Sequence, residues 1–341
     1  MFKSQDILNS YNFARQSDVV FSEIVTKTQF QTLNLKNVEI IDENERLIFY
    51  KLTELTLKEN DIIFCNTDVV KNLFKLLSKI KNLKNIKIIT NQTDTLIDKA
   101  LYDLKPVCVN SWYSINVGYV AEDLIPIPLG LSNDYSPKNI LVNDIKFNGL
   151  NKNSKNFLYL NFSRNTNFSE RSGLYNNYEK KEWTVVNNPG LQMDDYQSSL
   201  EKYRYILCPW GNGVDTHRVW ETLYSGNIPV TKKHHTFSTS KGLPILFIPE
   251  YEDITLENLT TFYDNIKGDK NMYEKLDINF WIEDIKKFRI ESEKSEKIRE
   301  SLIETKKFIF LHKTKSKFFS RLKKVKYYLR KIRKIKKLIN S

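Results

Sequence analysis

Short apolar runs separated by polar or turn residues recur along the first half of the sequence. They are DIIFCN at 61–66, IKIIT at 86–90, PVCVN at 106–110 and IPIPLG at 125–130. Between the first two runs, residues 69–83 place apolar side chains three and four positions apart, which predicts a helix. The alternation of strand, helix and strand is typical of a parallel sheet covered on both faces.

The alternation starts again after a polar stretch rich in Asn and Lys at 143–156, which has the composition of a linker. Five further apolar runs follow, at 157–162, 183–186, 204–209, 228–231 and 245–249. We therefore predict an α/β protein with two Rossmann-like units, whose ligand lies at the carboxyl ends of the strands.

The predicted organisation has four parts. The first Rossmann-like unit covers 1–150 and the second covers 151–268. A helical, charged segment follows at 269–312, and a basic tail occupies 313–341.

The net charge of +12 is concentrated in this tail. Residues 313–341 hold 13 of the 53 Lys and Arg residues and no Asp or Glu, so 40 basic residues face 41 acidic ones elsewhere. A near-neutral body argues against a nucleic-acid groove through the fold. Within 316–339 apolar residues recur at helical spacing among the basic ones, which predicts an amphipathic helix on an anionic membrane surface. Nucleic-acid binding and a loosely ordered arm are the alternatives for the tail.

Cysteine usage and hydropathy bear on location. Cys65, Cys108 and Cys208 lie far apart in apolar runs, without the paired spacings of zinc or redox sites, so we expect reduced core residues. The start of the chain lacks the apolar segment of a signal peptide, and no run of about 18 apolar residues occurs. We expect a cytoplasmic protein, peripheral on the inner face of the membrane.

The stretch 203–229, YRYILCPWGNGVDTHRVWETLYSGNIP, carries the most chemical information. A strand is expected to run into the turn at 211–213, and a helix to start near Asp215. Such a turn exposes backbone N–H groups at a helix N-terminus, which is a favourable site for a diphosphate. Asp215 could equally be a helix N-cap.

Two charged side chains of the predicted helix strengthen this hypothesis. Arg218 and Glu221 are three residues apart and share a helix face. The arginine could pair with phosphate, and the carboxylate one turn deeper could accept hydrogen bonds from ribose hydroxyls. The alternative is a local ion pair between the two on a surface helix.

The string CPWGNGVDTHRVWETLYSGNIP closely resembles the donor-binding segment of the exostosin-like glycosyltransferase family. The family pattern runs from Cys-Pro through Gly-Asn-Gly and Asp-Thr-His-Arg to Trp-Glu and Gly-x-Ile-Pro, and this sequence keeps all of it. The resemblance implies that the donor-binding residues here are Gly211, Asn212, Gly213, Asp215, His217, Arg218 and Glu221.

The resemblance extends upstream, and in total it covers about 60–250. FLYLNFSRNTNFSERSGL looks like the family strand that leads to further donor-binding residues, which would be Asn161, Ser163, Thr166 and Arg171. DIIFCNTDVV and IITNQTD resemble two N-terminal motifs that end in Asp68 and Asp94. The family implies the GT-B fold, in which two Rossmann-like domains face each other across a cleft.

The chain departs from the family at 91–94. Relatives usually carry His-Asn-Ser-Asp where this sequence has Asn91, Gln92, Thr93 and Asp94. The aspartate is kept and the histidine is lost, which affects acceptor recognition more than donor binding.

The predicted activity is transfer of a sugar from a nucleotide-diphosphate sugar to a hydroxyl of a glycan or lipid-linked acceptor, in surface polysaccharide or glycoconjugate synthesis. Arg171, Arg218 and the amides of 211–213 would stabilise the departing diphosphate. Asp94 is the first candidate for the base and Asp68 the second, although either could be a helix cap or a loop residue.

No cofactor or metal is expected, because no two aspartates are separated by one residue as in metal-dependent GT-A enzymes. One base acting in a single displacement would give inversion. Two other functions stay open: a catalytically inactive protein that binds a nucleotide sugar or glycan, and a nucleic-acid-binding protein acting through its tail.

Overall fold

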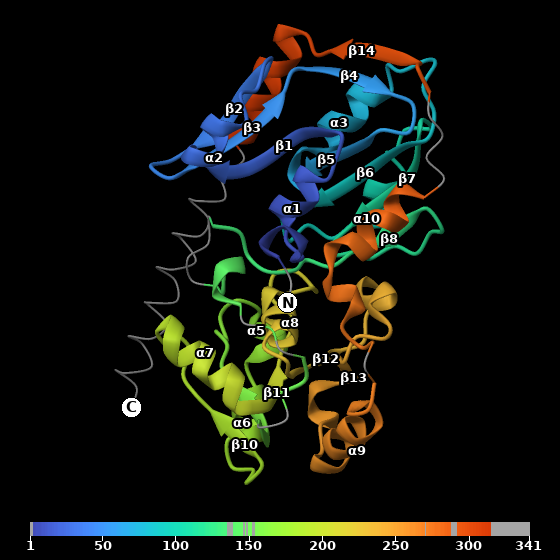
Figure 1. Ribbon diagram of the computed structural model, residues 1–341. Coiled ribbons are helices and arrows are strands. Elements are labelled where there is room, and N and C mark those ends of the chain that lie inside the picture. Colours follow the sequence, from blue (N-terminus) through green and yellow to red (C-terminus); the bar gives the residue numbers. More distant parts are fainter. Residues whose placement is uncertain are drawn as a thin grey trace.

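The computed structural model describes residues 3–134, 139–145, 147, 149–151, 154–269, 271–287 and 292–314. The described chain is a mixed α/β protein with two large sheets, which occupy the upper and lower parts of Figure 1. Of the residues predicted to bind a membrane, 316–339 lie outside the described part.

Seven strands form the first sheet, in the order β2-β3-β1-β5-β6-β7-β8. Strands β1, β5, β6, β7 and β8 run parallel to one another, while β3 pairs antiparallel with β1 and β2 pairs antiparallel with β3. The bounds are β1 Val19–Thr26, β2 Val38–Glu43, β3 Leu47–Leu52, β5 Ile62–Asn66, β6 Ile86–Asn91, β7 Val109–Ser114 and β8 Leu124–Pro126.

The second sheet has five strands in the order β10-β9-β11-β12-β13, all parallel. Its strands are β9 Lys155–Leu160, β10 Thr184–Val186, β11 Tyr203–Leu207, β12 Ile228–Lys232 and β13 Leu246–Ile248. Each coincides closely with an apolar run of the second half, so these predictions are confirmed.

Helices connect the strands and cover the sheets (Figure 1). They are α1 Ser10–Arg15, α2 Lys27–Thr32, α3 Val70–Leu77, α4 Lys99–Tyr102, α5 Phe168–Arg171, α6 Leu174–Tyr178, α7 Met193–Lys202, α8 His217–Tyr224, α9 Leu256–Ile266 and α10 Ile278–Lys286. The helix predicted at 69–83 ends at Leu77, because Lys79 and Ile80 donate to carbonyls three residues back and tighten the chain into a turn.

The largest difference from the sequence prediction lies before residue 61, where no strand was predicted. In β2 only Ile41 is fully buried, and three of the six residues are acidic, so this edge strand lacks the continuous apolar run that marked the buried strands. A second difference is β14 Ser295–Arg299, which interrupts a stretch expected to be helical and pairs with β4 Glu54–Lys58. Residues 302–314 are helical again.

A single buried cluster packs residues of both halves together. It joins Phe64 of β5 to Trp220 of α8 and Trp281 of α10. Tyr224 fixes three segments at once, since its hydroxyl accepts from the Leu8 amide at 2.8 Å and donates to the Leu276 carbonyl at 2.6 Å. The segment around Leu8, the segment before α10 and both sheets therefore share one core.

The cysteines form no disulfide: Cys65 and Cys208 are buried and Cys108 is half-buried. Among the described residues, no helix is both long and apolar enough to cross a membrane.

Candidate functional site

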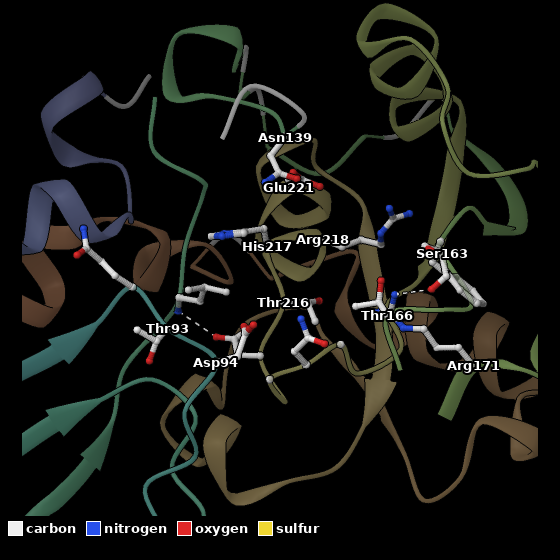
Figure 2. A pocket seen from close by; sticks show the side chains of 17 residues that line it. Thr93, Asp94, Asn139, Ser163, Thr166, Arg171, Thr216, His217, Arg218 and Glu221 are labelled. Atoms are coloured by element: carbon white, nitrogen blue, oxygen red, sulfur yellow. Dashed lines mark hydrogen bonds between the residues drawn. The ribbon is translucent and has the colours of Figure 1, made fainter. Parts of the chain in front are cut away.

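A cavity of about 520 Å³ lies where the strands of both sheets end. Its walls come from the residues after β6, from the segment after β9 and from the loop between β11 and α8. Figure 2 shows Thr93 and Asp94 on one side of the view, Ser163 and Arg171 on the other, and Arg218 between them. The structure thus collects most of the residues that the sequence predicted, namely Asp94, Ser163, Thr166, Arg171, Gly211, Asn212, Gly213, Asp215, His217, Arg218 and Glu221.

Helix α8 begins at this cavity. Its N-cap Thr216 makes no side-chain capping bond, and the buried Thr216 hydroxyl has no partner within the described part of the chain. The preceding turn is closed by the Gly211 amide, which donates to the Gly213 carbonyl at 2.9 Å. An uncapped helix start beside a glycine turn is suited to an anion, because the first amides and the helix dipole both favour negative charge.

Arg218 and Glu221 contact other groups rather than each other in the described structure. Arg218 donates to the Asn161 carbonyl and lies over the Tyr196 ring, 5.1 Å from its centroid. The Glu221 carboxylate is buried and accepts from the Tyr196 hydroxyl at 2.7 Å and the Ile140 amide at 3.2 Å. Burial opposes the charge on Arg218, but Tyr196 and Glu221 raise its pKa. The alternative of an exposed ion pair on a surface helix is therefore wrong.

Arg171 has a different environment. Its guanidinium donates to three backbone carbonyls: Trp210 at 2.8 Å, Ser163 at 3.1 Å and Pro209 at 2.7 Å. Burial, followed by the nearby Arg218, lowers the pKa of Arg171 to about 10. The side chain ties the loop after β9 to the loop after β11 and places one positive charge behind the cavity.

Asp215 lies at the base of the cavity and is 2 % exposed. Its carboxylate accepts from the Leu129 amide and from the Trp220 indole, both at 2.9 Å. Burial raises the pKa of Asp215 to about 7, against the effect of these bonds. A carboxylate held this way links α8 to the segment after β8.

Gly213 of the second half lies against the Asn116 side chain of the first half. Asn116 has a left-handed backbone, with φ 52°, and its side-chain oxygen accepts from the Asp215 amide at 2.9 Å. A Cβ on Gly213 would lie 2.8 Å from the Asn116 side chain, so a larger residue there would push Asn116 away from the Asp215 amide.

The first half contributes Gln92 and Asp94 to the cavity wall. His217, from α8 of the second half, lines the same cavity. Asp94 is exposed, at the end of β6. Gln92 is bound to β1, since its side-chain oxygen accepts from the Ile24 amide at 2.8 Å and its nitrogen donates to the Ile24 carbonyl at 3.0 Å. His217 Nδ1 lies 2.8 Å from the Gly130 carbonyl, which leaves Nε2 as the nitrogen with a lone pair when the ring is neutral.

A second cavity, of about 560 Å³, adjoins the first and shares Asn139, Phe162, Ser163, Arg218 and Glu221 with it. Asn161 lines this second cavity, and its side chain donates to the Asn188 carbonyl at 2.9 Å. The remaining walls are the segment 189–193 and Tyr196 of α7.

Asp68, the second predicted base, lies elsewhere. It lines a cavity of about 330 Å³ between α3 and the helical residues 302–314. Its carboxylate accepts from the Thr95 hydroxyl at 3.0 Å.

Several lining residues were not predicted from the sequence. Tyr196 belongs to a helix with no distinctive motif, and only the folded chain brings its hydroxyl to Glu221. Leu129 was not predicted as a site residue either, although it lies in the apolar run 125–130. Within the described residues, no group of three or more His, Cys, Asp or Glu side chains could hold a metal ion.

Comparison with models of known protein families gives no match, and comparison with curated protein sequences gives none. Among solved structures, one described as the GtfA/B complex aligns with a TM-score of 0.32 and 8 % identity, over 67 % of this chain and 54 % of that chain. The chain thus spans about half the length of that structure. An α1,3-fucosyltransferase aligns with a TM-score of 0.29 and 11 % identity, over 64 % of this chain and 70 % of the other. Scores this low decide neither fold family nor function.

Proposed function

We propose that this chain is a glycosyltransferase of the GT-B type. It would transfer a sugar from a nucleotide-diphosphate sugar to a hydroxyl of a glycan or lipid-linked acceptor, with inversion and without a metal ion. The observation that carries the proposal is the start of α8, where an uncapped helix end, Arg218 and Glu221 meet at the junction of two cavities.

The donor fits this junction in two parts. The diphosphate would lie in the first cavity against the turn 211–213, where Arg218 and the helix dipole balance its charge. The nucleoside would extend into the second cavity beside Tyr196, with Glu221 accepting hydrogen bonds from the ribose hydroxyls. During transfer, negative charge grows on the leaving diphosphate, and fixed positive groups there lower the barrier.

The acceptor would approach from the side of the first half. Asp94 is the proposed base, because it lines the same cavity as Arg218 and is open to solvent. It would take the proton of the acceptor hydroxyl as that oxygen attacks the anomeric carbon and the diphosphate leaves. Asp68 has no part in the proposal, since it lines another cavity.

The acceptor class and the basic tail favour a location at a membrane surface. A lipid-linked or surface glycan acceptor is presented there, and 316–339 would attach to anionic lipid head groups on the cytoplasmic side.

Donor binding tests the proposal. The native chain is screened by thermal shift and hydrolysis against a panel of nucleotide-diphosphate sugars, together with Arg218→Ala and Glu221→Gln. We expect one donor to bind and be turned over, and the Arg218→Ala variant to bind it on the order of 10- to 100-fold more weakly, through loss of charge-assisted hydrogen bonds.

Arg164→Ala is the matched control, because Arg164 is an exposed arginine of the same half whose guanidinium lies over Tyr175 outside both cavities. It should bind the donor as the native chain does. Binding without hydrolysis or transfer to any acceptor would favour the inactive binding protein. If no nucleotide or nucleotide sugar binds the folded chain, the site assignment is wrong.

A further inference from the structure

The helical residues 302–314 leave large apolar side chains in solvent. On the inner side, Thr305 is buried, the Phe308 ring lies 5.0 Å from the Lys51 ammonium, and the His312 ring lies 5.6 Å from that of Phe49 in β3. On the outer side, four large residues are between 56 % and 80 % exposed: Leu302, Ile303, Phe310 and Leu311. Exposed Lys306, Lys307 and Lys313 are interleaved with them.

A cavity of about 330 Å³ opens beside this helix, against α3. Lys71 and Lys75 of α3, Lys79 just beyond it and Lys307 line the cavity. The lysines of α3 are four residues apart and so follow one helix face.

Three acidic side chains line this cavity, and each has a partner. The Asp68 carboxylate accepts from the Thr95 hydroxyl at 3.0 Å. Glu300 pairs with the buried Lys51 and also accepts from Asn72 at 2.7 Å. Glu304 pairs with Lys79 at 3.2 Å. Within the described residues, no carboxylate lies within ion-pair distance of Lys71, Lys75 or Lys307. These three lysines face one carboxylate outside an ion pair, Asp68, so the cavity presents excess positive charge.

The charge of the cavity and the exposed apolar side chains together indicate which binding partner this surface fits. The basic tail of the same chain would be repelled, because 313–341 contains 13 Lys and Arg and no acidic residue. A small free anion would satisfy the lysines but would leave Ile303 and Phe310 in water. An anionic bilayer satisfies both, since head-group phosphates attract the lysines while the apolar side chains enter the acyl boundary.

We propose that the helical residues 302–314 and the lysines of α3 form a membrane-docking face, with the cavity holding the phosphate of an anionic lipid head group. At this face apolar side chains would insert into the bilayer and the cavity would bind one head group. The basic tail would add only a general attraction to anionic lipids. It does not depend on the proposed transferase activity.

Vesicle sedimentation of the full chain tests the proposal. The vesicles contain phosphatidylcholine alone or a mixture with phosphatidylglycerol. Ile303→Ser combined with Phe310→Ser should weaken binding to mixed vesicles at least about tenfold, because two inserted apolar side chains are lost. Lys75→Gln combined with Lys307→Gln should weaken it on the order of tenfold. Leu256→Ser is the matched control, since Leu256 is an exposed apolar residue of α9, at the opposite end of the molecule from α3 (Figure 1), and it should leave binding unchanged.

Thermal unfolding and donor binding of each variant should match those of the native chain, which separates this test from that of the transferase activity. Three results would overturn the proposal. They are equal binding of both double variants and the native chain, equal binding to both kinds of vesicle, and stabilisation by inorganic phosphate without any vesicle binding.

Discussion

Arg171 and Arg218 lie at the same cavity but offer different chemistry to a ligand. All three nitrogens of Arg171 donate to backbone carbonyls, so this side chain is occupied in holding two loops together. The single backbone bond of Arg218, to Asn161, leaves it donors for an anion. We therefore expect loss of Arg218 to affect donor affinity directly, and loss of Arg171 to act through the shape of the loops.

Variants of Asp94 and His217 distinguish a residue that acts as the base from one that contacts the donor. Asp94→Asn should lower kcat on the order of 100-fold and leave the donor dissociation constant nearly unchanged, because only proton transfer is lost. His217→Asn should instead weaken donor binding. Steady-state kinetics and donor titration on both variants provide the check, and the reverse pattern would assign the base to His217 Nε2.

The buried Asp215 should make stability depend on pH. Burial raises its pKa from 3.8 to about 7, so between these values the folded chain holds a proton that the unfolded chain has released. The contribution of Asp215 to the free energy of unfolding therefore falls as pH rises from about 4 to about 7, by up to roughly 4 kcal/mol.

Denaturant titrations of the native chain and of Asp215→Asn across this range measure the effect. The variant loses one hydrogen bond at every pH, but relative to the native chain its stability should improve as pH rises. A difference that stays constant with pH would show that Asp215 does not titrate in the folded chain.

At the scale of elements, α8 connects the core to the site. All residues from Val219 to Tyr224 are buried, which fixes the helix axis, while its first turn carries His217 and Arg218 into the cavity. The last turn ends at Gly226, whose φ is 72° and whose missing Cβ would lie 2.1 Å from the Gly149 carbonyl oxygen.

Gly226→Ala should therefore destabilise the chain by about 2–4 kcal/mol, because a side chain is disfavoured by both the backbone conformation and the contact. Gly268→Ala is the control, since a Cβ there meets nothing within 4 Å and its φ is not positive. Chemical denaturation measures both variants. Equal stability of the two would mean that the chain around Gly149 moves away at little cost.

At the scale of the whole molecule, the end of the described chain returns to the first sheet. Strand β14 pairs with β4, and Glu300 reaches the fully buried Lys51 of β3. Burial lowers the pKa of Lys51, and the bond to Glu300 favours its charged form. The C-terminal segment is thereby anchored to residues about 250 positions earlier in the chain.

Glu300→Ala leaves a buried ammonium without its partner and should cost about 3–5 kcal/mol of stability. Asp264→Ala removes an exposed pair with Lys267 and should cost less than about 1 kcal/mol. Thermal unfolding compares the two variants. Similar losses would show that Lys51 gives up its proton when Glu300 is removed, at little cost to the fold.

The local pattern of apolar, glycine and helix-forming residues in the sequence determined most of the secondary structure. Continuous apolar runs identified β5, β6 and the strands of the second sheet, because strands buried on both faces need no alternation. The turn 211–213 and the start of α8 were also predictable, since glycine and helix signals act over a few residues. Eleven of the thirteen predicted site residues line one cavity, and ten of them lie in two short segments, 163–171 and 211–221.

Contacts between distant residues were decided only by the tertiary structure. The sequence offered Asp94 as the first candidate base and Asp68 as the second, and the path of the chain after β5 and β6 places them in separate cavities. It predicted Arg171 as a donor contact, but it gave no sign that the guanidinium also bonds the Trp210 and Pro209 carbonyls of the loop after β11. The pairing of β14 with β4 joins segments about 240 residues apart, and no local pattern encodes a partner at that distance. The sequence alone determined which elements form and which residue types meet the cavity, while packing determined which side chains remain free to act there.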